Sequence, residues 1–68
     1  MKAVSGKDLA RLVEAKGWIL QRVHGSHHIY ARSGSVVRLS IPIHGSKPLK
    51  IGLQSHLMKL AGITESDL

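Results

Sequence analysis

The sequence predicts a small α+β protein with the element order α-β-β-β-α. Two stretches, residues 6–16 and 48–61, carry apolar residues at the three- and four-residue spacing of helices that bury one side. Between them, residues 18–23, 27–32 and 36–41 change to a two-residue alternation with many β-favouring side chains. Only a few residues separate these runs, which favours a three-stranded antiparallel meander.

The first helix has a start signal and a stop signal. Ser5 is a good N-cap, and Asp8 is a short-armed version of the acid in a capping box. Gly17 suits the position after the last helical residue, where the backbone turns left-handed. These signals predict a helix over residues 6–16.

Turn residues separate the remaining elements. Residues 24–26 break the first strand, residues 33–35 form a tight Ser-Gly-Ser turn, and Pro42 ends the third strand. The second helix closes at Gly62, and a last short turn follows. A three-stranded sheet needs cover, so both helices should pack on one face and leave the other open. This is the layout of the double-stranded-RNA-binding domain, although a fold alone does not determine a function.

Length and charge limit the functions to consider. The 68 residues predict one domain over 1–68, too small to enclose a deep substrate cavity. Ten Lys and Arg against four acidic residues give a net charge of +6, which favours a polyanionic partner over a merely basic surface. The absence of cysteine excludes disulfides and thiolate metal sites. With no membrane-length apolar run and no signal peptide, we expect a cytoplasmic protein without a membrane partner.

Four of the five histidines are expected to gather at one end of the sheet. Pairing around the turn at residues 33–35 places Arg32 opposite Val36 and His27 opposite Ile41. The same register, extended past the strand end, places His24 opposite His44, with His28 alongside. The loop that starts there carries Lys47 and Lys50 to the first turn of the second helix, which is a favourable position for an anion.

This combination suits the cleavage of RNA. The reaction needs a base for the 2′-OH proton and an acid for the leaving 5′-oxygen, and histidine titrates near neutral pH. Cationic side chains can stabilise the transition state without a metal or other cofactor. Zinc binding by the four histidines is the alternative, but a ligand set without cysteine or carboxylate is poor. His44 is the candidate for a supporting acid or phosphate contact, whereas His56, Trp18 and Tyr30 are expected to be structural.

The motif Gly25-Ser26-His27-His28-Ile29-Tyr30 resembles the G-S-H-x-x-(Y/F) signature of HicA toxins, the small RNases of HicA–HicB toxin–antitoxin pairs. The similarity continues in register over nearly the whole chain. It includes residues 5–7, Leu12 and residues 17–18 early in the chain. Its second half comprises residues 41–44, Lys47, Leu49, Gly52, Leu57 and residues 61–63.

The resemblance implies a dsRBD-like fold, cleavage of mRNA and a HicB-type antitoxin that covers the active site. It assigns the catalytic role to His27, which follows Gly-Ser at the start of the second strand. Ser26 and His28 beside it, with Lys47 and Lys50, are the expected RNA contacts. Residues 54–56 read Gln-Ser-His where many relatives read Thr-Leu-Arg-Ser, so an arginine that could hold RNA is absent.

Two other classes of function stay open at this point. A non-catalytic RNA- or DNA-binding module would also be basic, but simple binding does not require the Gly25-Ser26-His27 motif. An adaptor whose basic surface meets an acidic protein would share the same charge, and an antitoxin would itself be such a partner.

Overall fold

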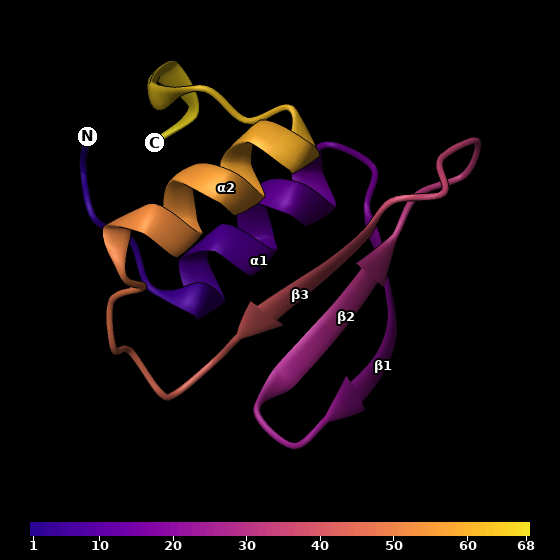
Figure 1. Cartoon of the computed structure of the whole chain (residues 1–68), viewed down its shortest axis with the longest axis horizontal. Helices are drawn as coiled ribbons and strands as arrows, with labels where there is room; N and C mark the ends of the chain where they lie inside the picture. The colour runs from indigo at the N-terminus through magenta and orange to yellow at the C-terminus, as the bar shows by residue number, and fades with distance from the viewer.

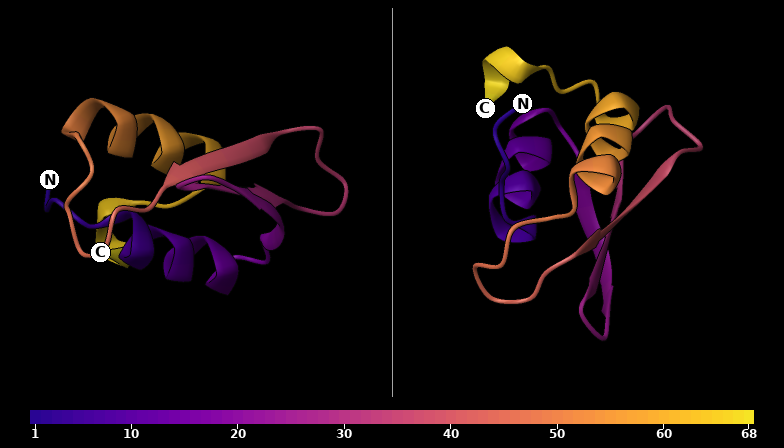
Figure 2. Two further views of the ribbon diagram at one scale, coloured as in Figure 1. Left: turned by 90° about the horizontal axis from the view of Figure 1, so that it is seen from below. Right: turned by 60° about the vertical axis from the view of Figure 1, so that its left-hand side comes forward.

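The computed structural model describes all 68 residues and has the predicted α+β element order (Figure 1). The elements are α1 (Gly6–Ala15), β1 (Ile19–His24), β2 (His27–Ala31), β3 (Arg38–Pro42), α2 (Ile51–Ala61) and a short 3-10 turn, η1 (Glu65–Asp67). The strands form one antiparallel sheet in the order β1-β2-β3, which confirms the meander. The helices lie side by side next to β3, and β2 and β1 extend away from them (Figures 1 and 2).

The core lies between the two helices and one side of the sheet. Along β3, Leu39 and Ile41 are fully buried, whereas Arg38 and Ser40 are exposed. Tyr30, opposite Leu39, belongs to the same core. Because side chains alternate along a strand, the helices cover one side of the hairpin only. We call this the helix side, and we call the other, which carries Arg38 and Ser40, the open side.

Helix α1 starts as its sequence predicts. The Ser5 hydroxyl accepts a hydrogen bond from the backbone N–H of Asp8 at 3.1 Å, and Gly17 has the left-handed φ of 93° after the helix end. Gly6, in the first turn, packs so closely on the end of β3 that a Cβ would overlap the carbonyl oxygen of Pro42. Glycine there lets α1 approach the strand that carries much of the core.

Helix α2 begins at Ile51, so the predicted start at residue 48 is wrong. The residues before it are extended because they pair with the N-terminal segment: the N–H of Leu49 donates to Val4 O at 2.9 Å. Gln54, fully buried, strengthens this join. Its Oε1 accepts from the N–H of Val4 at 2.9 Å, and its Nε2 donates to Lys2 O at 2.6 Å.

The predicted register of β2 against β3 is also wrong, by one residue. His27 lies opposite Pro42, and His28 lies opposite Ile41. A turn forms at Ser33-Gly34, where the N–H of Ser35 donates to Arg32 O at 3.1 Å, but the strands are joined by the longer stretch 32–37, so the turn alone does not set the pairing. Since a one-residue slip exchanges the two faces of a strand, this register keeps His27 off the side that buries Ile41.

Candidate active site

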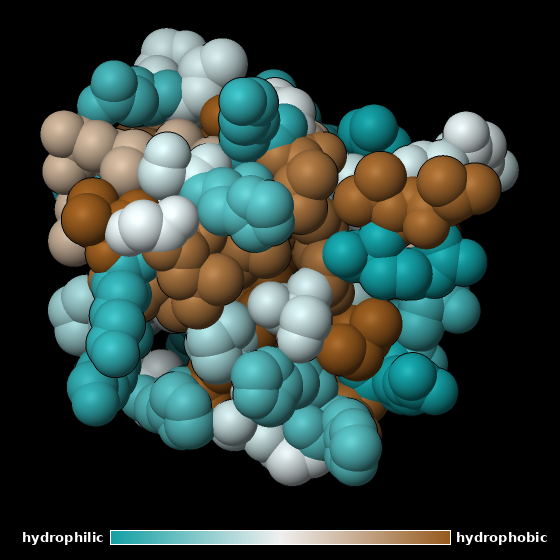
Figure 3. All heavy atoms as spheres, in the orientation of Figure 1, coloured by the Kyte–Doolittle hydropathy of each residue, from teal (hydrophilic) through white to brown (hydrophobic).

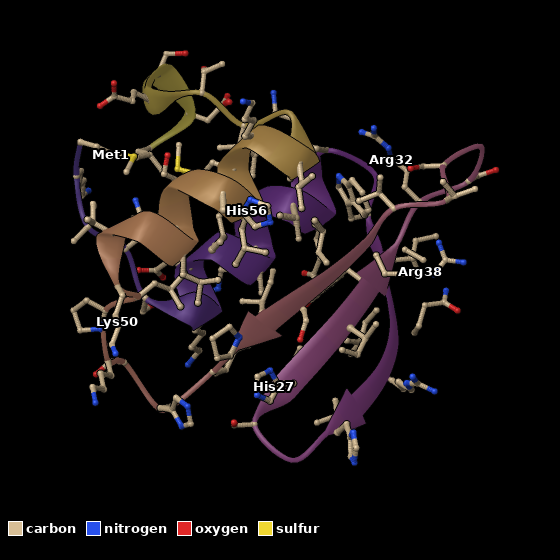
Figure 4. The ribbon with its side chains drawn as sticks, in the orientation of Figure 1. Met1, His27, Arg32, Arg38, Lys50 and His56 are labelled. Carbon is tan, nitrogen blue, oxygen red and sulfur yellow. The ribbon has the colours of Figure 1, made fainter.

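His27 is the first residue of β2 and is exposed on the open side of the sheet (Figure 4). Its Nδ1 lies 3.1 Å from the hydroxyl oxygen of Ser40 on β3. A serine hydroxyl can donate or accept, so it can pair with either neutral form of the imidazole. The contact orients the ring and leaves Nε2 for a substrate.

Ser40 is a site residue that the sequence prediction missed. The sequence signal for Ser40 is the alternation along β3, where the exposed Arg38 and Ser40 alternate with the buried Leu39 and Ile41. Ser40 pairs with Ile29, two residues from His27 along β2 and on the same side. Only the correct register brings the hydroxyl beside the imidazole.

The four histidines lie at the predicted end of the sheet, where β1 ends, β2 begins and β3 ends, but they do not share one surface. His24 is the β1 partner of His27, but His28 alternates to the helix side, between Val23 and Ile41. His44 lies in the exposed loop after β3. No three side chains of the metal-binding types come close enough to share an ion.

The loop between β3 and α2 brings His44, Lys47 and Lys50 together around a hollow of about 330 Å³. We call it the loop hollow; Pro42, Pro48, Leu49 and Leu53 complete its lining. Pro42 is the cross-strand partner of His27, so the hollow adjoins the histidine without including it. Lys50 is the N-cap of α2, and no side chain caps the backbone N–H groups of its first turn.

Ser26 and His28 are placed differently from these basic residues. Ser26 is half-buried, and its carbonyl oxygen accepts from the N–H of Ile43 at 2.8 Å, which joins the turn before β2 to the loop after β3. His28 is half-buried on the helix side, so it does not share a surface with His27. Their contacts with RNA stay predictions.

All four acidic side chains lie on α1 or at the C-terminal end, and residues 15–64 contain none. Each has a partner: Asp8 with Arg11 at 3.7 Å, Glu14 with the hydroxyl of Tyr30 at 2.7 Å, Glu65 with the N-terminal amine at 3.4 Å, and Asp67 with Lys16 at 3.4 Å. The open side of the sheet and the lining of the loop hollow therefore carry basic residues and no carboxylate. Figure 3 shows hydrophilic residues over the sheet and along its lower edge, around an apolar centre.

Two groups outside the site have shifted pKa values. Burial raises the pKa of Tyr30 above its ordinary value, and its hydrogen bond to the Glu14 carboxylate and the charge of that group raise it further. The pKa of Asp67 is lowered by the hydrogen bond from the backbone N–H of Thr64, which outweighs the opposing effect of burial with help from Lys16. Both shifts belong to groups that hold the fold together.

The aromatic pair belongs to the core, as predicted. Trp18 and Tyr30 are each only 2% exposed, so neither can stack on a base. Trp18 donates from Nε1 to Ala61 O at 3.3 Å, and the guanidinium of Arg32 lies 4.7 Å from its ring centre. His56 points outward from α2, away from His27 (Figure 4).

Comparison with known proteins identifies the family of the chain. The model of the HicA toxin of bacterial toxin–antitoxin systems matches residues 6–63, which include every element from α1 to α2. No individual curated protein matches the sequence. No helix is long and apolar enough to cross a membrane. The chain therefore belongs to the HicA toxin family of bacterial toxin–antitoxin systems, and this membership implies an antitoxin partner.

Proposed function

We propose that the protein is a metal-independent endoribonuclease that cleaves mRNA. The observation that carries the proposal is the contact between His27 and Ser40, at 3.1 Å on an exposed surface without carboxylates. A catalytic base for RNA must be accessible and held in one orientation. His27 meets both requirements.

The reaction balances with one proton taken and one returned. His27 Nε2 accepts the proton of a ribose 2′-OH while its Nδ1–H donates to the Ser40 hydroxyl. The 2′-oxygen bonds to the adjacent phosphorus, and the bond from phosphorus to the 5′-oxygen breaks. The leaving oxygen takes a proton from a general acid, which gives a 2′,3′-cyclic phosphate and a free 5′-OH.

The loop hollow supplies the remaining groups. Lys47 and Lys50 stabilise the negative charge that builds on the phosphorane-like transition state, because fixed cations are effective where charge develops. His44, on the same hollow, is our candidate for the general acid or for a further phosphate contact. Ser26 and His28 are proposed as secondary RNA contacts.

The antitoxin is proposed to be a HicB-type protein that covers this surface. A partner that covers His27 and the loop hollow would block access of RNA to both. Its contact surface should be acidic, since the area that it covers carries lysines and histidines without carboxylates.

The test is cleavage of a defined mRNA in EDTA by the purified protein and by His27→Ala. We expect the variant to lose on the order of 10²- to 10⁴-fold in rate, the range for a missing general base. His56→Ala is the matched control, since it removes an exposed histidine from α2 and should cleave at the wild-type rate. Expression in cells should arrest growth for the wild type and His56→Ala but not for His27→Ala.

Two results would contradict the proposal. Cleavage by His27→Ala at the wild-type rate would remove the central residue, and loss of wild-type cleavage in EDTA would favour a metal-dependent reaction. RNA that stays intact but bound, with a steep salt dependence, would instead identify a non-catalytic nucleic-acid-binding module.

A further inference from the structure

A second basic hollow lies on the other side of His27 from the loop hollow. It measures about 390 Å³ and is lined by Gln21, Arg22, Ile29 and Arg38. We call it the sheet hollow. Ile29 is two residues from His27 on the same side of β2, so the sheet hollow lies on the open side. His27 thus stands between two hollows, each with two Lys or Arg side chains and no carboxylate.

An irregularity in β1 brings Arg22 to this surface. Leu20 pairs with Tyr30, but the next pair is Arg22 with Ile29, so Gln21 is an extra residue in β1. In a regular ladder Gln21 would stand opposite Ile29. The bulge puts an arginine there instead, and bulges are known to redirect side chains beside functional sites.

Arg38 is available to a phosphate as well. It is exposed and lies opposite Ala31, further along β2 than Ile29. Its Nη1 donates only to backbone oxygens, to Ser35 O at 3.3 Å and Val37 O at 3.2 Å. No acidic side chain competes for the guanidinium, which has five N–H donors.

Both arginines lie beyond His27 in the same direction along β2, one on each neighbouring strand. Arg22 on β1 is opposite the residue two along β2, and Arg38 on β3 is opposite the residue four along, which are offsets of roughly 7 and 13 Å along β2 at the rise of a strand. An RNA strand that runs along β2 from His27 would therefore pass between the two arginines. Figure 4 shows His27 between Lys50, at the start of α2, and Arg38, at the start of β3.

We propose that single-stranded RNA lies across the open side of the sheet, from the loop hollow past His27 to Arg22 and Arg38. This inference rests on the proposed ribonuclease function and names the path of its substrate. The arginines hold the phosphates beyond the cleaved bond, and binding tolerates many sequences because phosphate contacts carry no sequence information.

The test measures binding of a single-stranded RNA of roughly ten nucleotides at salt concentrations from about 50 to 200 mM. His27→Ala serves as the parent, so that the RNA stays intact. Arg22→Gln and Arg38→Gln, added singly, should each weaken binding several-fold and reduce the slope of log K against log salt by about 0.7, the value for one lost phosphate contact on a single strand.

Arg11→Gln is the matched control. It removes the same charge from an exposed arginine on α1, beside Asp8 and away from the open side, and should leave the salt slope unchanged. Thermal unfolding of all three variants checks that the fold is intact. The proposed path is wrong if Arg22→Gln and Arg38→Gln bind RNA like Arg11→Gln, or if duplex RNA competes as well as single-stranded RNA. It is also wrong if the two changes weaken binding of the antitoxin but not binding of RNA.

These results are independent of the catalytic test. If the wild type does not cleave RNA but the two arginine changes reduce the salt slope, the path holds and the ribonuclease proposal fails. If the wild type cleaves and the slope is unaffected by both changes, the path alone fails.

Discussion

The two sides of the β2–β3 hairpin differ in almost every property, although they are built from the same ten residues. On the helix side, Leu39 and Ile41 are fully buried and Tyr30 is 2% exposed. The Tyr30 hydroxyl, which lies there too, donates to Glu14 at 2.7 Å. On the open side, His27 and Ser40 are exposed and contact each other at 3.1 Å.

The difference shows how so small a chain can separate stability from chemistry. A domain of this size has too little core to surround a substrate. Alternation along two strands gives it a packed surface and an accessible surface that share one backbone. Changes on the helix side should therefore alter the free energy of unfolding, and changes on the open side should alter activity.

Of the changes that test this separation, Leu39→Ala on the helix side is expected to have the largest effect on stability. Truncating a fully buried leucine removes apolar contacts and leaves a cavity, so the free energy of unfolding should fall by about 3 kcal/mol. Urea denaturation measures this change. RNA cleavage per folded molecule should be retained; a fully folded variant without activity would show that the two sides are not separate.

Tyr30→Phe should have an intermediate effect. It deletes the hydrogen bond to the exposed Glu14 carboxylate and should cost about 1 to 1.5 kcal/mol. The pKa of Tyr30 is raised in the folded state above its ordinary 10.0, so its contribution to stability is complete below pH 10 and declines as the pH rises above it. Unfolding measured between neutral pH and about pH 11 should show this decline in the wild type and less of it in Tyr30→Phe. If stability declines equally with pH in both proteins, groups other than Tyr30 cause the decline.

The smallest effect is expected from Ser40→Ala, on the open side. Losing a neutral hydrogen bond of about 1 kcal/mol should slow cleavage roughly fivefold, with an unchanged unfolding midpoint. Ser40→Thr, which keeps the hydroxyl, should restore most of the rate. A positioning role also predicts an altered pH profile of kcat/KM in Ser40→Ala, and a variant with wild-type rate and profile would remove Ser40 from the site.

Much of the fold could be predicted from the sequence, because local patterns encode local structure. Ser5 and Gly17 mark the two ends of α1, and the change from a three- or four-residue spacing to a two-residue one marks the strands. Strand alternation correctly separated His27 from His28. The start of α2 was misjudged because a buried Gln54 and the partners of Leu49 hold residues 48–50 extended, and these contacts come from the distant N-terminus.

The order of elements, the basic charge and the motif that singles out His27 follow from the sequence alone, since each depends on neighbouring residues or on composition. The register of β2 against β3 depends on tertiary packing, because burial of Leu39 and Ile41, rather than the intervening loop, sets that pairing. That register puts Ser40 beside His27, and the bulge at Gln21 turns Arg22 to the same side. These contacts join strands that are distant along the chain, and only the packed sheet brings them together.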